Sequence, residues 1–164
     1  MVLLVQYTLI FASVLALVAL GGCFSEHSGV INIGLEGIMV MGALGGALAM
    51  KFLPATTPGI VLFILIVLAS VLVGMAFSLL LGFAAIHFNA DQTLVGTALN
   101  LMGTAAAVVI VRAINVAENP DNVSSTVVYR QAKQVFLVKI GDFEFNWFML
   151  IIVLAIIASH IVLY

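Results

Sequence analysis

The chain has 164 residues, of which 65% are hydrophobic and 7% are charged, and its formal net charge is −2. An average soluble protein has about 25% charged residues, so this composition identifies an integral membrane protein. The few basic residues form no cluster of the kind that binds nucleic acid, and the single cysteine, Cys23, excludes an internal disulfide and a cysteine-based metal site.

Five apolar stretches are long enough, or nearly so, to cross a membrane as helices, which takes about 20 residues each. Short loops join the first four, so we expect antiparallel neighbours in an all-α, polytopic helix bundle that forms one domain over residues 1–164. The five predicted spans are Leu3–Gly21, Ile33–Met50, Gly59–Phe88, Thr93–Ile114 and Phe145–Tyr164.

The segment Phe24–Gly37, between the first two spans, is polar and punctuated by glycines. Its second carboxylate, Glu36, is followed at once by an apolar run, which makes it a candidate for a charge at membrane depth. We interpret the segment as a bend that interrupts the two spans. Ser25, Glu26 and His27 are expected to order this bend.

Small residues recur at helical spacing in the second and third spans. Gly42 and Gly46 form a GxxxG pair, and such pairs let neighbouring helix backbones approach closely in a membrane. In the third span, Ser70, Gly74, Ser78 and Gly82 recur at every fourth residue. Helix packing is therefore the role predicted for Gly34, Gly37, Gly42, Gly46 and Gly74.

Asn100 lies in the middle of the fourth span, on one stripe with Thr93, Thr97 and Thr104. A buried amide is costly unless it is hydrogen-bonded or faces water, so Asn100 is expected to face protein or a wet cavity rather than lipid. Two interpretations stay open: a polar contact between helices, or part of the lining of a permeation pathway.

A polar segment, Asn115–Glu144, follows the fourth span and is expected to form an extramembrane cap. Within it, the strand-prone tract Val135–Ile140, the turn Gly141–Asp142 and the stretch Phe143–Phe145 predict a small hairpin. The last span stops at Tyr164 without a polar or basic flank, so we expect the chain to be truncated or the N-terminal part of a longer protein.

Residue patterns for enzyme chemistry are missing from the sequence. The three histidines are scattered, and no nucleophile, metal-protease or phosphate-loop motif occurs, so neither catalysis nor a cofactor is predicted. Two classes remain, a transporter component and a non-transporting membrane scaffold. A broken helix that carries Asn32 and Glu36 favours the transporter.

Two tracts resemble the nucleoside and simple-sugar permeases of binding-protein-dependent ABC importers. The first is GGCFSEHSGVINIGLEG, residues 21–37, and the second is ADQTLVGTALNL, residues 90–101. The resemblance implies a bacterial inner-membrane permease that pairs with a second permease subunit, a cytoplasmic ABC ATPase and an extracytoplasmic substrate-binding lipoprotein. Asn32, Glu36 and Asn100 are then the residues expected at the pathway or its gate.

The chain departs from that pattern at His27, where the family often has Arg, and in its length, which is about half that of family members. Two indications of the orientation of the chain in the membrane also conflict. The basic residues Lys51, Arg112, Arg130, Lys133 and Lys139 favour a cytoplasmic cap by the positive-inside rule, whereas the resemblance implies that the cap is outside. We expect the cap to be outside.

Overall fold

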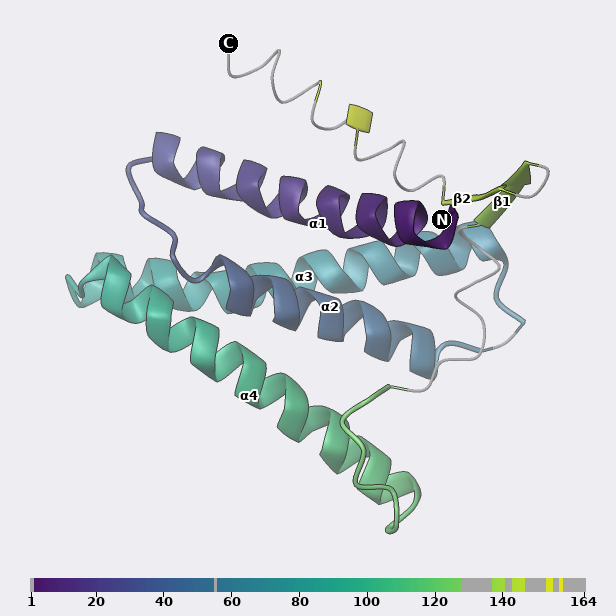
Figure 1. The fold of residues 1–164 in the computed structure, drawn as a ribbon. Coiled ribbons are helices and arrows are strands. Elements are labelled where there is room, and N and C mark those ends of the chain that lie inside the picture. Colours follow the sequence, from purple (N-terminus) through teal and green to yellow (C-terminus); the bar gives the residue numbers. More distant parts are fainter. Residues whose placement is uncertain are drawn as a thin grey trace. The chain divides into compact units, whose positions relative to one another are not determined.

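The computed structural model describes residues 2–54, 56–127, 137–140, 143–146, 153–154 and 157. Four helices dominate these residues, and each is long and apolar enough to cross a membrane. They are followed by two short strands (Figure 1). The helices are α1 Val2–His27, α2 Leu35–Phe52, α3 Gly59–His87 and α4 Gln92–Glu118, and the strands are β1 Leu137–Ile140 and β2 Phe143–Asn146.

The predicted polytopic helical fold is confirmed, with shifts at some helix ends. α1 continues past the predicted end at Gly21, because the chain keeps its helical hydrogen bonds until Gly29 adopts a φ of 83°. α2 begins two residues later than predicted. α4 continues past the predicted end at Ile114 to Glu118, so the predicted cap does not begin at Asn115, which is a buried helical residue.

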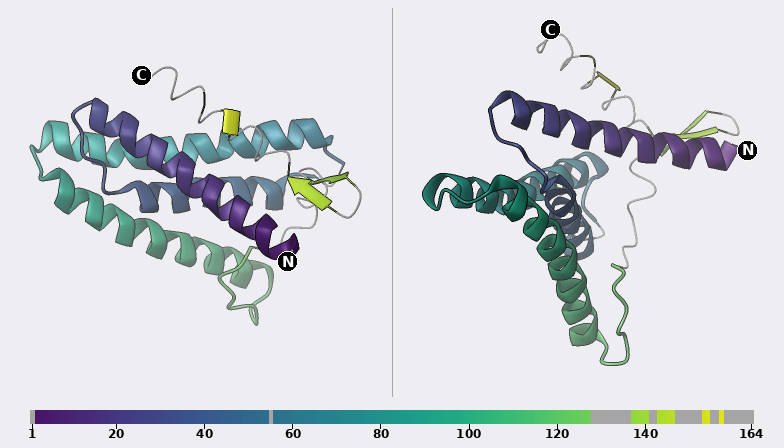
Figure 2. Two further views of the ribbon diagram at one scale, coloured as in Figure 1. Left: turned by 45° about the horizontal axis from the view of Figure 1, so that its top comes forward. Right: turned by 60° about the vertical axis from the view of Figure 1, so that its left-hand side comes forward.

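Residues 30–131 form one of the two compact units of the chain, and α2 is its central element. α3 lies along one side of α2 and α4 along the other (Figure 2). Against α3, a Cβ added at Gly42 would lie 3.2 Å from the Ser70 carbonyl oxygen, and one added at Gly74 would lie 3.7 Å from the Cα of Gly42. Small residues therefore set the close approach of α2 and α3.

The opposite side of α2 meets α4 at a second set of glycines. A Cβ on Gly37 would lie 2.9 Å from the Cα of Asn100, and a Cβ on Gly103 would lie 2.9 Å from the Cα of Gly37. Between the three helices, Phe77, Leu81 and Leu99 form a buried apolar cluster. α2 thus packs backbone to backbone on two sides, through different glycines.

The other unit comprises residues 1–29 and 132–164. In it, β1 and β2 pair antiparallel with Ile140 opposite Phe143, so the predicted hairpin is confirmed, although its turn residues, 141–142, lie outside the described ones. The predicted fifth span also lies mostly outside them. Its first residue, Phe145, belongs to β2, while residues 153, 154 and 157 are helical.

Candidate functional site

The segment that joins α1 to α2 is held on α4 by two amide side chains. Asn100 accepts a hydrogen bond from the backbone N–H of Gly37 at 2.7 Å and donates one to the carbonyl oxygen of Ile33 at 2.8 Å. Gln92 accepts a further bond from the N–H of Ile31 at 2.9 Å. A single helix therefore fixes both the bend and the start of α2.

Asn100 does for α2 what a helix-capping residue normally does from within its own helix. The N-cap residue of α2 is Gly34, which has no side chain to accept a bond from the first turn. Capping side chains usually accept from the N–H of the second or third helical residue, and Gly37 is the third. With both polar atoms of its amide engaged, Asn100 is a contact between helices.

Asn32 lies beside this cap with an unusual side chain. Its Oδ1 atom is buried and has no hydrogen-bond partner, the one such side-chain atom among the described residues. It faces the start of α2, since a Cβ on Gly34 would lie 3.4 Å from it. An unpaired buried acceptor costs roughly 1–3 kcal/mol of folding free energy. The bend therefore carries this cost at Asn32, because no described group donates a hydrogen bond to its Oδ1.

The helix contacts show that α2 begins deeper than its neighbours end. Gly37 is level with Asn100, and Gly42 and Ile38 are level with Gly74. At 1.5 Å per residue, α3 and α4 both extend about 10 Å beyond the first residue of α2 at that end. Gly82 fits this register, because nothing lies within 4 Å of a Cβ added to it. Residues 31–34 lie above the start of α2, since Ile31 bonds to Gln92 and Gly34 packs against Gly96.

Glu36 stands in the first turn of α2, and its side chain is exposed. The carboxylate is turned away from α3, since helical periodicity places it about 100° from Gly37 and opposite to the α3-facing glycines. Thr97 is exposed on the corresponding side of α4.

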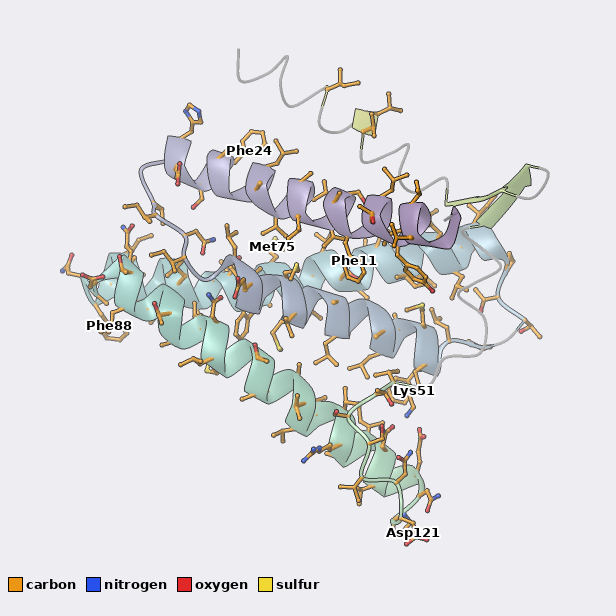
Figure 3. The ribbon with its side chains drawn as sticks, viewed as in Figure 1. Phe11, Phe24, Lys51, Met75, Phe88 and Asp121 are labelled. Carbon is orange, nitrogen blue, oxygen red and sulfur yellow. The ribbon has the colours of Figure 1, made fainter. Side chains whose placement is uncertain are left out.

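The far end of the same helix pair carries a second polar cluster, which the sequence did not reveal. Lys51 donates to Oδ1 of Asn115 at 3.3 Å and pairs with Glu118 at 2.9 Å. Asn115 is 2% exposed and donates to the carbonyl oxygens of Ser124 and Thr126. Figure 3 shows Lys51 at the end of α2, beside the loop that carries Asp121 at its tip.

Two of the three predicted pathway residues contact the start of α2, and the third, Glu36, lies in the first turn of α2 next to Gly37. Asn32 and Asn100 both meet the backbone at the start of α2, whereas Glu36 points away from that contact. Ser25, Glu26 and His27 lie in the last turn of α1, before the bend. There the carbonyl oxygen of Ser25 accepts the N–H and the hydroxyl of Ser28, which ends the helix.

Two roles were missed because they depend on contacts between distant parts of the chain. Gln92 lies in the tract of residues 90–101, but the sequence alone indicates no contact for it. Lys51 is indicated only as a charge that flanks the second span. One signal was available: a lone lysine in the last turn of an apolar helix needs a polar partner. Among the described residues, no group of His, Cys, Asp and Glu could hold a metal ion.

Comparison with known proteins identifies the family. The model of the family described as branched-chain amino acid transport system / permease component matches residues 4–164. The chain belongs to this permease family. It is a multi-pass inner-membrane protein, and four of its described helices are long and apolar enough to cross a membrane.

Several curated members of this permease family are similar to the chain. The guanosine ABC transporter permease protein NupQ of Bacillus subtilis is 45% identical over 116 residues, which cover 68% of this chain and 35% of that protein. The nucleoside ABC transporter permease protein NupC of Lactococcus lactis is 36% identical, over 67% of this chain and 34% of that protein.

An archaeal relative extends the comparison. The putative glucose ABC transporter permease protein TsgC13 of Haloferax volcanii is 37% identical over 62% of this chain and 29% of that protein. The chain spans about one third of the length of the curated relatives that it matches. No solved structure matches it.

The geometry gives physical tasks to the tract that resembles the permease family. Asp91 caps α4 by accepting the N–H groups of Thr93 and Leu94, at 2.8 and 3.1 Å. Gln92 and Asn100 then hold the bend, and Gly96 lets it come close, since a Cβ there would lie 2.9 Å from the backbone nitrogen of Gly34. Both tracts that carry the resemblance therefore meet at one contact.

Proposed function

We propose that the chain forms part of the solute pathway of an ABC importer for nucleosides or simple sugars. The permease family and the names of the relatives support this assignment. The proposed assembly pairs the chain with a second permease subunit, a cytoplasmic ABC ATPase and an extracytoplasmic substrate-binding lipoprotein. ATP hydrolysis belongs to the partners, and no chemistry on the solute is proposed.

The observation that carries the proposal is the depth at which α2 begins. Transporters use helices that start inside the membrane, because irregular backbone is tolerated there only where protein or a water-filled cavity surrounds it. α3 and α4 are each about 40 Å long, against a hydrocarbon core of about 30 Å. With α3 and α4 centred on that core, we propose that Glu36 lies within it, because α2 begins about 10 Å inside their ends.

The three predicted pathway residues take different parts in this proposal. Glu36 lines the pathway, because its carboxylate is exposed in the first turn of α2. Asn100 and Asn32 belong to the gate: Asn100 fixes the bend to α4, and Asn32 keeps an unused acceptor beside it. Gly34, Gly37, Gly42, Gly46 and Gly74 allow the helix contacts on which this geometry depends.

Uptake of a radiolabelled nucleoside tests the proposal in cells that express the chain with a second permease subunit, an ABC ATPase and a substrate-binding lipoprotein. We expect uptake that depends on the ATPase and the binding protein, and a loss of about ten-fold or more with Glu36→Gln at unchanged protein level. The matched control is Gly82→Ala, which meets nothing within 4 Å. A stable membrane complex that lacks both partners and shows no uptake would favour the scaffold function instead.

Orientation is a separate element of the proposal. We place the cap outside, as the resemblance implies, so that the start of α2 is toward the cytoplasm. Ser125 is exposed in the loop after α4, and Ser125→Cys in a Cys23→Ser background gives a single reporter thiol. Reaction with an impermeant maleimide on intact cells is the expected result, and protection until the membrane is opened would reverse the orientation.

A further inference from the structure

A single side chain joins the loop 119–127 to both α2 and α4. Asn115, near the end of α4, is 2% exposed, and its Nδ2 donates to the carbonyl oxygens of Ser124 at 2.9 Å and Thr126 at 3.0 Å. Its Oδ1 accepts a hydrogen bond from Nζ of Lys51, in the last turn of α2, at 3.3 Å. One buried amide therefore contacts α2 on one side and the loop on the other.

The orientation of this amide is fixed from both sides. A lysine ammonium only donates hydrogen bonds and a carbonyl oxygen only accepts them, so the oxygen of Asn115 must face Lys51 and its nitrogen must face the loop. Both N–H groups of the amide are used in this orientation. Without Lys51, the buried oxygen loses its donor, and a rotated amide would turn that oxygen toward two carbonyl oxygens that repel it. Lys51 thus decides whether Asn115 can hold the loop.

Other contacts of the loop do not replace this one. The remaining side-chain hydrogen bonds that the structure describes in the loop join residues within it. The ion pair of Lys51 with Glu118 joins α2 to α4 rather than to the loop. In the described part of the chain, the attachment of residues 124–126 to the helices therefore depends on Asn115.

We infer that Lys51 is a positioning residue that couples α2 to the loop 119–127 through the amide of Asn115. A shift of the last turn of α2 withdraws the lysine from the amide and releases the loop, and a displaced loop likewise frees the lysine, because such coupling is reciprocal. The use of this coupling in transport rests on the proposed function. Glu36 lies in the first turn of the helix that Lys51 ends, so a movement of α2 along its axis would reach the loop.

The coupling can be measured as the spread of positions that the loop takes. Ser125→Cys in the loop and Val109→Cys on α4 place nitroxide labels at two exposed positions, and Cys23→Ser removes the native thiol. Double electron–electron resonance on the full chain in detergent micelles gives the distribution of distances between the labels. We expect a narrow distribution with Lys51 in place and one about two-fold wider or more with Lys51→Met, because the loop then opens locally.

Three further variants separate the amide contact from charge and from stability. Asn115→Asp still accepts from Lys51 but cannot donate to the loop, so it should widen the distribution as much as Lys51→Met does. Glu118→Gln removes the ion pair and leaves the amide contact, so the distribution should stay narrow. Leu81→Ala opens a cavity in the buried cluster of the three helices, which lowers stability without touching the loop, and should also leave it narrow.

Any of four results would overturn the inference: a wide distribution with Lys51 in place, no widening with Lys51→Met, no widening with Asn115→Asp, or equal widening with Glu118→Gln or Leu81→Ala. The outcome is distinct from that of the proposed function. Widening that depends on Lys51 without nucleoside uptake keeps the coupling and removes the importer, whereas uptake with a distribution that Lys51→Met does not change removes only the coupling.

Discussion

Asn100 and Asn115 lie about four helical turns apart on α4, and each joins α2 to another part of the unit. The amide of Asn100 accepts a hydrogen bond from the first turn of α2 and donates one to the carbonyl oxygen of Ile33. The amide of Asn115 accepts a hydrogen bond from Lys51 and donates to two carbonyl oxygens of the loop after α4. The same amide chemistry therefore holds both ends of the α2–α4 pair.

The two ends differ in how their charges are treated. At the far end, Lys51 is 11% exposed and is paired with Glu118. At the start of α2, Glu36 is exposed and has no ion pair among the described residues. The charge at the end of α2 is therefore matched within the unit, whereas the charge at its start is matched by no described residue.

Replacing each of these two asparagines by alanine should give the largest losses of stability, and the two losses should differ. Asn115→Ala removes one of the two partners of Lys51 and leaves the carbonyl groups of Ser124 and Thr126 without their donor, so we expect a loss of about 3 kcal/mol in the free energy of unfolding. Asn100→Ala leaves one N–H and one carbonyl group without a partner, at about 2 kcal/mol. Unfolding in mixed micelles by circular dichroism measures both. An Asn100 variant that is the less stable of the two would contradict this ranking.

Close packing is expected to be the next most sensitive property. A Cβ at Gly37 would press on the backbone of Leu99 and Asn100, so Gly37→Ala should cost about 2 kcal/mol by forcing the helices apart. The same micelle assay applies, with Gly82→Ala as the matched control because that position is open. Equal stability of the two variants would show that α2 and α4 do not meet at Gly37.

The ion pair at the far end should give the smallest and most asymmetric effect. Lys51→Met removes the donor to a buried amide oxygen, at about 1 kcal/mol. Glu118→Gln should cost less than about 0.5 kcal/mol, because Glu118 is 56% exposed and exposed pairs contribute little. Melting temperatures in detergent compare the two, and a larger loss for Glu118→Gln would mean that the carboxylate is the buried partner.

The helices were predictable because apolar length depends on nothing outside each segment. Gly59 as the start of α3 was predicted correctly, and the hairpin followed from a strand-prone tract and a turn. The position of Asn115 was not predictable, since its partners return to it from a loop. A sequence shows a polar residue near a helix end, but not the carbonyl groups that will meet it there.

The candidate site was predictable in composition and not in geometry. Asn32, Glu36 and Asn100 stood out because amides and carboxylates are costly between apolar runs. Which of them faces a backbone and which stays exposed depends on the rotation of α2 against α4, and that rotation is fixed by Gly37 and Gly103. Small residues at helical spacing predict a close helix contact, but they do not show which helix is the partner.

The spacing of Asn100 and Asn115 on α4 also sets the length of α2. Asn100 bonds to Gly37 and Asn115 bonds to Lys51, so the stretch of α2 from Gly37 to Lys51 must match the length of α4 between the two asparagines. Deleting one residue from that stretch would draw the lysine back by about 1.5 Å and turn it by about 100°, away from its amide. Substitutions in the middle of α2 can be absorbed locally, whereas a single insertion or deletion there puts one end out of register.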